Sequence, residues 1–170
     1  MGKITRIEQQ KKKKNRVNIY IDGEFSLGLY KDTVIKFHLY ENKEITPSEI
    51  SQIKEFEEFA DAKEKAINYI SYRERSRKEI KDYLTSKGIG NEIAKQILVD
   101  LEKANLVDDH KFASAWIKDR SKNNPRGNFA LKMELKEKGI GDSEIENILQ
   151  MVDEKENALK AFEKAVRKYG

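Results

Sequence analysis

The feature that most constrains the fold is an internal repeat in the part of the chain after residue 65. Residues 66–73 (AINYISYR) return as residues 113–120 (ASAWIKDR), 47 positions later. Residues 84–89 (LTSKGI) return as residues 135–140 (LKEKGI), 51 positions later. A repeat of this length is typical of an array of small helical modules. The change in offset predicts a short insertion around residues 123–125 (NNP), where a helix should break.

Each copy of the repeat is expected to fold as three helices. The second helix ends in Lys-Gly-Ile, and Gly88 and Gly139 suit the left-handed backbone position that follows a helix. The isoleucine after each glycine can then pack back on Leu84 or Leu135, as in a Schellman motif. Because such small units bury little apolar surface alone, we expect neighbouring copies to share part of their core.

Polar residues indicate where several helices begin. Asn91 and Asp142 are expected to cap the third helices of the two copies. Asp108 and Asp109 are expected to cap the helix that opens the second copy. Residues 46–49 (TPSE) predict another helix start, since threonine and glutamate at this spacing form a capping box and proline fits the first helical position.

The N-terminal part of the chain carries strand patterns. Residues 16–21 (RVNIYI) and 25–29 (FSLGL) alternate apolar and polar positions, and the Asp-Gly at residues 22–23 suits a two-residue turn. This predicts a β-hairpin, with a weaker third strand at residues 3–8. A lone hairpin is marginal in water, so a short helix at residues 33–37 is expected to pack against it.

These patterns predict a mainly α-helical protein, in which tandem three-helix-bundle repeats follow an N-terminal β-hairpin extension. Hydrophobic residues make up only 38% of the chain, as many as the charged ones, so we expect an elongated array of thin layers. The last helix opens an incomplete third repeat, which suggests that the natural protein is longer. The expected segments are a hairpin arm with its short helix (1–45), an acidic connecting helix (46–65), repeat 1 (66–108), repeat 2 (109–152) and the first helix of repeat 3 (153–170).

The composition argues against catalysis. The chain has no cysteine, and its two histidines, His38 and His110, fall in different predicted modules. No metalloprotease, P-loop or serine-hydrolase motif is present, so we expect no catalytic residue, no metal site and no cofactor. No apolar run approaches the length needed to cross a bilayer. The absence of cysteine fits a cytoplasmic protein. We expect the protein to be a monomer, with His110 at its surface.

A lysine run gives the N-terminal arm a positive charge. Four consecutive lysines precede the first predicted hairpin strand, and they are expected in a disordered segment or a hairpin-tip loop. A basic arm suggests an anionic partner such as nucleic acid, although a lysine run also keeps a loop soluble. Charge alone leaves both readings open. The residues of this run are Lys11, Lys12, Lys13 and Lys14.

Basic residues also gather at equivalent places in the two repeats, near the end of the first helix. An array would therefore present a basic ridge at each repeat, suited to phosphates or to an acidic protein groove. Alternatively, these side chains merely complement the dipole at a helix C-terminus. The candidates are Arg73, Arg75, Arg77 and Lys78 in copy one, and Lys118, Arg120, Lys122 and Arg126 in copy two.

An aromatic residue precedes each basic group. Tyr69 and Trp116 occupy matching positions, which favours a shared core role over a binding hot spot. Arg73 and Arg120 follow them by four residues, so each arginine is predicted to stack on the ring one turn earlier. Glu134 lies four residues before Lys138, and this spacing is typical of a solvated ion pair on a helix surface.

The segment from residue 106 to 140 resembles the central repeat of the RecX family, and residues 66–89 resemble the family's first repeat. The N-terminal hairpin resembles the extension of its longer members. The residues of the structural motif are Tyr69, Gly88, Asp108, Asp109, Phe112, Trp116, Gly127, Leu135 and Gly139. Arg120 and Arg126 also match the central pattern.

The resemblance implies a regulator of the RecA recombinase. Such a protein binds RecA filaments on single-stranded DNA and mainly inhibits recombinase, ATPase and coprotease activity, in DNA repair and the SOS response. It catalyses no reaction, and it contacts DNA chiefly through the filament, with weak direct binding as a further option. Two alternatives are a stand-alone helix-turn-helix-like DNA-binding protein and a scaffold without any link to nucleic acid.

Overall fold

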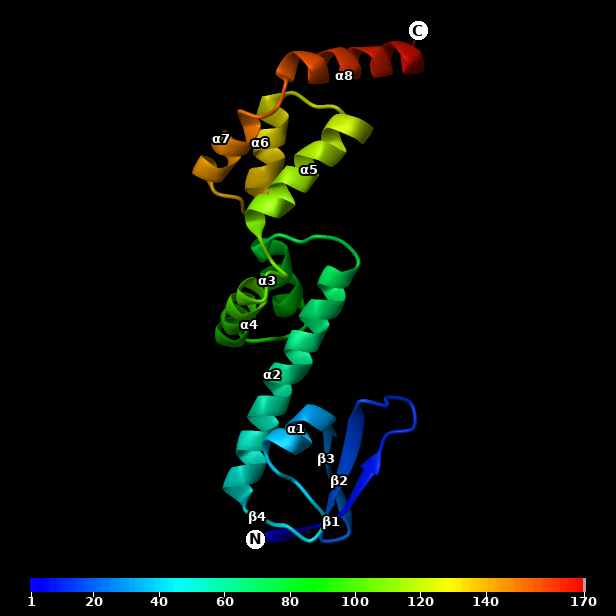
Figure 1. The fold of residues 1–170 in the computed structure, drawn as a ribbon, viewed down its shortest axis with the longest axis vertical. Helices are drawn as coiled ribbons and strands as arrows, with labels where there is room; N and C mark the ends of the chain where they lie inside the picture. The colour runs from blue at the N-terminus through cyan, green and yellow to red at the C-terminus, as the bar shows by residue number, and fades with distance from the viewer. Residues whose placement is uncertain (170) are drawn as a thin grey trace. The chain divides into compact units, whose positions relative to one another are not determined.

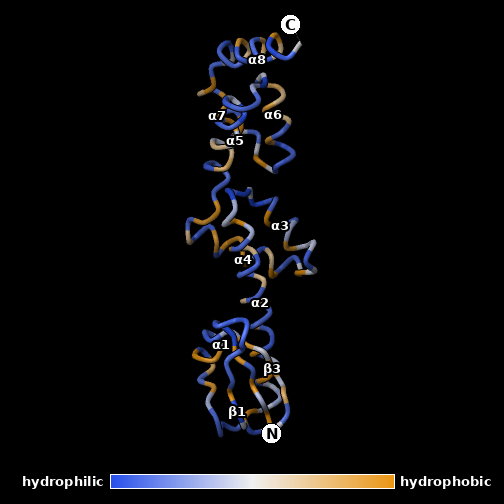
Figure 2. Tube along the Cα trace, turned by 90° about the vertical axis from the view of Figure 1, so that its right-hand side faces the viewer, coloured by the Kyte–Doolittle hydropathy of each residue, from blue (hydrophilic) through white to orange (hydrophobic). Residues whose placement is uncertain are grey.

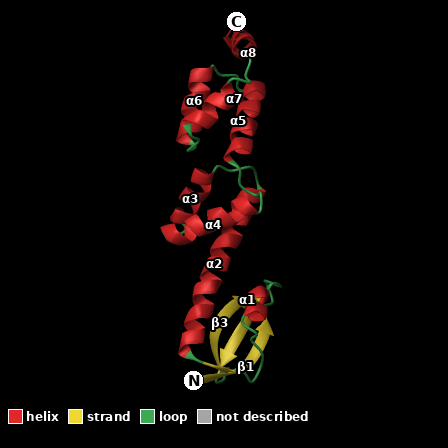
Figure 3. Cartoon of the chain, turned by 60° about the vertical axis from the view of Figure 1, so that its left-hand side comes forward, coloured by secondary structure: helices red, strands yellow, loops and turns green. Residues whose placement is uncertain are grey.

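The structure is a computed structural model that describes residues 1–169. Its chain divides into two compact units, residues 1–64 and the part from Lys65 onward. Strands occur in the first unit and helices make up the second (Figures 1 and 3). This architecture confirms a mainly helical protein with a small N-terminal β-structure.

The first unit contains a four-stranded antiparallel sheet in the order β3-β2-β1-β4. The predicted hairpin is the pair β2–β3, and its turn places both Asp22 and Gly23 at positive φ, 51° and 89°. The weaker third strand is confirmed as β1, whereas the two-residue strand β4 had no sequence signal. The bounds are β1 (Gly2–Gln9), β2 (Arg16–Ile21), β3 (Glu24–Tyr30) and β4 (Glu44–Ile45).

A register shift in the hairpin overturns one expectation. Alternation over residues 25–29 places Phe25 on the same face as Leu27, but Phe25 is 60% exposed and Leu27 is buried. The register shifts between Ile19 and Tyr20, so that Phe25 pairs with Tyr20 instead of Ile21. The rings of Phe25 and Tyr20 meet edge to face on the exposed side, with centroids 6.0 Å apart.

A buried carboxylate joins this sheet to two helices, α1 (Lys31–Lys36) and α2 (Pro47–Ser71). Glu57 of α2 is only 9% exposed and accepts hydrogen bonds from the Tyr30 backbone NH and from Thr33 Oγ1, at 3.0 and 2.7 Å. Arg16 of β2 pairs with the same carboxylate at 3.0 Å. A buried charge is tolerated only with such partners, so Glu57 fixes how α2 lies on the strands of this unit.

Helix α2 is longer than either helix predicted there. The expected connecting helix and the first helix of copy one form a single helix, without a break at residue 65, that ends at Ser71. The reason is local, because no glycine occurs within it and its proline occupies the first position. The capping box at its start is confirmed by reciprocal hydrogen bonds between Thr46 and Glu49. The division of the chain into five segments stays a prediction.

The second unit holds two three-helix modules in tandem. The first combines the end of α2 with α3 (Arg77–Ser86) and α4 (Asn91–Lys103). The second combines α5 (Asp109–Asn123), α6 (Asn128–Glu137) and α7 (Asp142–Leu149), and α8 (Glu154–Tyr169) follows. Helix α5 ends where the insertion was predicted, and each module buries its own aliphatic side chains.

The turns after α3 and α6 confirm the predicted Schellman motifs. Gly88 and Gly139 have φ of +78° and +80°. Ile89 donates its backbone NH to the carbonyl of Leu84, and the corresponding bond recurs in the second module. The prediction that Asn91 and Asp142 cap the third helices is wrong. Gly90 and Gly141 occupy the cap positions of α4 and α7, and neither helix has a side-chain cap. Asn91 and Asp142 are already the first helical residues.

Apolar residues are spread along the strands and helices instead of forming one long run (Figure 2). Among residues 1–169, no helix combines the length and the hydropathy needed to span a bilayer.

The two Schellman glycines provide a matched test of packing. Gly139 lies against Lys78 of the first module, where an added Cβ would approach the lysine Cβ to 2.7 Å, whereas Gly88 faces open space. We expect Gly88→Ala to lower the free energy of unfolding by about 1 kcal/mol through backbone strain alone. Gly139→Ala should cost about 1 kcal/mol more, because it also displaces Lys78. Urea unfolding monitored by circular dichroism measures both, and equal losses would contradict the close approach.

Candidate partner-binding surface

The basic candidates of the first module gather around the loop that follows α2. Arg73 makes two hydrogen bonds to the carboxylate of Glu79, at 2.8 and 3.0 Å. Arg77 pairs with Glu102, and Lys78 pairs with Asp82 at 3.3 Å. The side chains of Arg73 and Arg77 stay 42% and 46% exposed, so each keeps one face toward solvent.

The second module builds a comparable centre around Glu134 of α6. This carboxylate accepts hydrogen bonds from the indole NH of Trp116 and from Arg120 Nε, both at 2.8 Å. Arg126 adds an ion pair at 3.2 Å. Glu134 therefore does not form the predicted surface pair with Lys138, because three nearer donors from α5 and the following loop occupy it.

The predicted stacking of arginine on aromatic rings is half right. Arg120 lies over Trp116, with its guanidinium carbon 4.5 Å from the ring centroid. In the first module Arg75, not Arg73, lies over Tyr69, at 3.9 Å. The difference arises because α2 ends at Ser71, so the four-residue helical spacing no longer places Arg73 beside the ring. Each module nevertheless presents one guanidinium stacked on an aromatic side chain.

The structure also corrects the idea of freely exposed arginines. Arg73, Arg77, Arg120 and Arg126 all have carboxylate partners within the chain, which lowers the positive charge available to a ligand. The two modules still keep a surplus of cations. Glu134 faces two arginines, and Glu79 faces Arg73 together with Lys138 at 2.7 Å. Each centre thus has two cations for one carboxylate, and the ridge is weaker than the sequence suggested.

The lysine candidates lie elsewhere. Lys118 and Lys122 are on α5. Lys11, Lys12, Lys13 and Lys14 are exposed in the β1–β2 connection. Backbone hydrogen bonds join Gln10 to Arg16 and Arg16 to Lys13, so this segment is a hairpin loop, one of the two forms expected.

A polar junction that sequence reasoning missed connects the two modules. Lys138, after α6, reaches Glu79 of α3, and the Ser76 hydroxyl donates to the Lys138 carbonyl oxygen at 2.7 Å. Arg77 donates its backbone NH to Asp109 of α5 at 2.8 Å. The sequence did carry a local signal, since Ser76 and Glu79 have capping-box spacing and form that box in the structure.

Electrostatics favour the ionised form of both central glutamates. Burial alone would raise the pKa of Glu79, but hydrogen bonds from Arg73 and Lys138 outweigh it and lower the pKa to about 2. The pKa of Glu134 is also lowered, because Arg120, Trp116 and Arg126 outweigh the effect of burial. Burial raises the pKa of Asp109 despite its bond from Arg77.

The remaining motif residues support the helices. Phe112 and Leu135 are buried in the core of the second module. Asp108 caps α5 by accepting from the Lys111 backbone NH, while Gly127 precedes α6 in an extended conformation that needs no glycine. His110 is exposed, as expected, and contacts Glu144. Among the side chains that the structure describes, no group of three histidine or carboxylate residues is arranged to hold a metal ion.

The junction predicts a pH dependence of stability. A carboxyl group with a lowered folded-state pKa stabilises the fold above its unfolded-state pKa of 4.5, and this contribution is lost as the pH falls toward about 2. We expect Glu79→Gln to cost about 2 kcal/mol near neutral pH, since hydrogen bonds to a charged group are lost. Urea unfolding of wild type and variant should converge as the pH falls through this window.

The matched control is Glu74→Gln, which removes the same charge from an exposed side chain in the neighbouring loop. It should leave the stability and its pH profile close to those of wild type. A Glu79→Gln variant that loses stability in parallel with wild type between pH 4.5 and pH 2 would show that Glu79 does not carry the dependence.

Comparison with known families matches all three parts of the fold. The family model for the regulatory protein RecX N-terminal domain matches residues 2–46 of the chain. The models of the first and second three-helix domains of RecX match residues 62–101 and 108–149. The match to the first three-helix domain begins at residue 62, which lies inside the continuous helix α2.

Relatives and solved structures agree with these matches. The chain is 36% identical over 167 residues to the regulatory protein RecX of Streptococcus sanguinis, covering 98% of this chain and 64% of that protein. It is 32% identical over 169 residues to the regulatory protein RecX of Clostridium perfringens, covering 99% and 79% of the two chains.

A crystal structure of a regulatory protein RecX superposes with a TM-score of 0.81 and 28% identity, over 98% of this chain and 85% of the other. The structure of RecX from Lactobacillus salivarius gives a TM-score of 0.59 and 27% identity, over 66% and 75% of the two chains. With its N-terminal sheet and both three-helix modules matched in order, the chain belongs to the RecX family.

Proposed function

We propose that this chain is a regulatory protein that binds RecA filaments on single-stranded DNA and mainly inhibits their recombinase, ATPase and coprotease activities. The family relatives are named regulatory protein RecX, which supports a regulatory role. The chain spans 64% of the length of the Streptococcus sanguinis relative, so the activity of the whole protein is part of the proposal. We propose that it acts in the cytoplasm, in DNA repair and the SOS response. The regulator itself would catalyse no reaction.

The observation that carries the proposal is that both modules hold an arginine stacked on an aromatic ring. Arg75 stacks on Tyr69 in the first module and Arg120 on Trp116 in the second. Each module also contains a glutamate, Glu79 or Glu134, that pairs with two cations. Similar groups repeated on tandem modules suit a partner that is itself periodic, such as a protein filament on DNA.

The charges of the third helices argue against a stand-alone helix-turn-helix protein. A recognition helix places basic and polar side chains in the major groove. Helix α7 (DSEIENIL) has three acidic residues and no basic one, and α4 (NEIAKQILVDLEK) has more acidic than basic residues. Neither helix therefore suits contact with phosphates.

A direct assay separates the proposed functions. Added to RecA, single-stranded DNA and ATP, the chain should reduce ATP turnover at less than one copy per RecA, while its binding to DNA alone stays weak. Tight binding to duplex DNA without inhibition would favour the DNA-binding alternative. Absence of both effects would leave only a scaffold role.

The two cationic centres can be tested together by Arg73→Ala with Arg126→Ala. Each glutamate then keeps one cation, so the surplus charge of both modules disappears. We expect inhibition to need about tenfold more protein, since a loss of about 1.4 kcal/mol changes affinity by that factor. The control, Lys81→Ala with Lys103→Ala, removes the same charge from two exposed helix positions. Equal loss in both double variants would point to overall charge instead of these centres.

The lysine loop should contribute by non-specific electrostatics. We expect replacement of Lys11, Lys12, Lys13 and Lys14 by serine to weaken binding to the RecA–DNA filament and to flatten its dependence on salt. Anisotropy of the labelled filament, measured over a series of salt concentrations, gives both quantities. An unchanged slope would assign the loop a purely structural role.

A further inference from the structure

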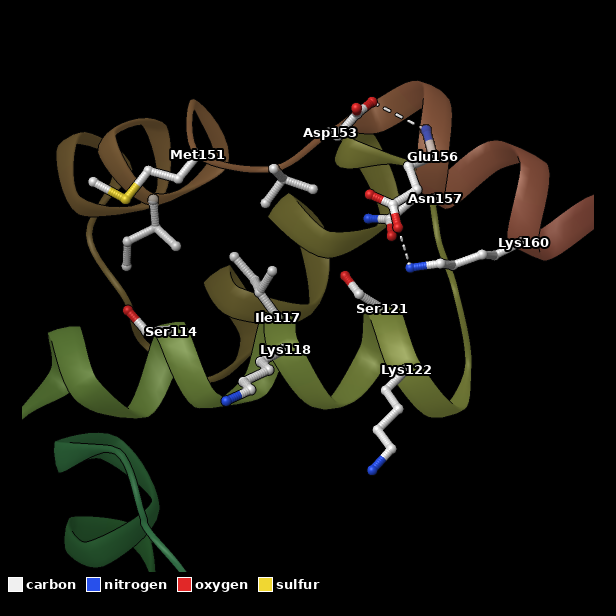
Figure 4. Close-up of a pocket in the computed structure, with 12 residues that line it drawn as sticks. Ser114, Ile117, Lys118, Ser121, Lys122, Met151, Asp153, Glu156, Asn157 and Lys160 are labelled. Atoms are coloured by element: carbon white, nitrogen blue, oxygen red, sulfur yellow. Dashed lines mark hydrogen bonds and ion pairs between the residues drawn. The ribbon is translucent and has the colours of Figure 1, made fainter.

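We infer that a groove between α5, the end of α7 and α8 binds an acidic peptide segment with an apolar anchor. The groove is distinct from the arginine–glutamate centres and has a volume of about 570 Å³. In Figure 4, α5 forms one wall and α8 the facing wall. Ile117, Ile148 and Val152 form its apolar part, and Lys118, Lys122 and Lys160 are among its polar lining.

The groove stays open because α8 presents its polar side to the second module. Asn157 and Lys160 line the groove, and Lys164 donates to the carbonyl oxygen of Asn123 at 2.6 Å. These three residues of α8 are spaced three and four apart and so share one face of the helix. The large apolar side chains of α8 lie away from the groove, with Phe162 67% exposed and Val166 51% exposed.

A buried amide in the groove lacks a hydrogen-bond partner. Asn157 is only 4% exposed, and its Nδ2 has no acceptor among the described residues. A buried donor left without an acceptor costs about 1–3 kcal/mol. Asn157 extends from α8 into the space facing Ser121 (Figure 4). The Nδ2 atom is closed off from solvent, so a ligand oxygen in the groove would satisfy it once the Asn157 side chain turns toward the groove.

The charges around the groove select a negative ligand. A second hollow of about 370 Å³ shares Lys122 and Lys160 with the groove and adds Lys164 and Arg167. The nearby acids are partly occupied, since Asp153 accepts from the Glu156 backbone NH and Glu156 pairs with Lys160. Lys118 and Lys122 are left to receive carboxylates at the edge of an apolar surface.

A peptide suits this lining better than a nucleic acid. Single-stranded DNA or RNA is commonly held by aromatic side chains on which bases stack, and none of the described residues lining either hollow is aromatic. A peptide can place an apolar side chain on Ile117 and Ile148 while its carboxylates meet the lysines.

The test uses the full chain and a fluorescent peptide of about twelve residues in which Asp and Glu alternate with Leu and Phe, a length that matches the short recognition segments of other grooves. Anisotropy should report saturable binding that weakens with salt. Lys118→Glu with Lys122→Glu should weaken binding at least about tenfold, because attraction at the rim becomes repulsion. Lys81→Glu with Lys103→Glu, the control with the same charge change, should leave it unaltered.

A second variant probes the buried amide. Asn157→Leu keeps the side-chain size but removes the donor, so peptide affinity should fall while the circular dichroism spectrum stays that of wild type. If Asn157→Leu does not fold, the Lys118→Glu/Lys122→Glu variant, which changes only exposed side chains, still tests the inference. Equal binding by wild type and by the Lys118→Glu/Lys122→Glu variant overturns the inference.

Two competitors test other occupants. An oligothymidine of equal charge that displaces the peptide at lower concentration would assign the groove to nucleic acid and overturn the inference. Sedimentation equilibrium tests a second copy of the chain, and self-association that competes with the peptide would overturn it as well. Because neither experiment contains RecA, failure here leaves the proposed filament function standing.

Discussion

The contact between the two modules centres on one partly buried carboxylate, whose side chain is 12% exposed. Glu79 of α3 receives Arg73 from its own module and Lys138 from the next, and these bonds outweigh the cost of its burial. A chain with as many charged as hydrophobic residues has little apolar surface to spare for contacts between modules. The contacts between the modules described above are a compact cluster of ion pairs and hydrogen bonds.

The same chemistry shapes the surface that a partner would meet. Glu134 orients Trp116 and Arg120 at once, so that the guanidinium is fixed over the indole ring instead of moving freely in solvent. Holding an arginine in place reduces the entropy lost on binding, even though its charge is partly neutralised. We interpret the centres as pre-shaped recognition surfaces more than as reservoirs of positive charge.

Several local features were predictable from the sequence, whereas contacts between distant residues were not. The Schellman glycines Gly88 and Gly139 and the capping box at residues 46–49 depend on neighbouring residues alone, and all were identified correctly. The bond between Glu79 and Lys138 joins residues 59 positions apart, and no periodicity encodes it. The partner of Arg73 was missed for a smaller reason, since ending α2 at Ser71 redirects the side chain.

The hydroxyl of Ser76 makes two hydrogen bonds, one within the first module and one to the second. Its oxygen accepts from the Glu79 backbone NH at the start of α3 and, as a donor, reaches the Lys138 carbonyl of the following module. Fraying of the first turn of α3 is therefore coupled to the contact with the following module. In a linear array such nearest-neighbour coupling favours the unfolding of adjacent repeats in one step over their unfolding in separate steps.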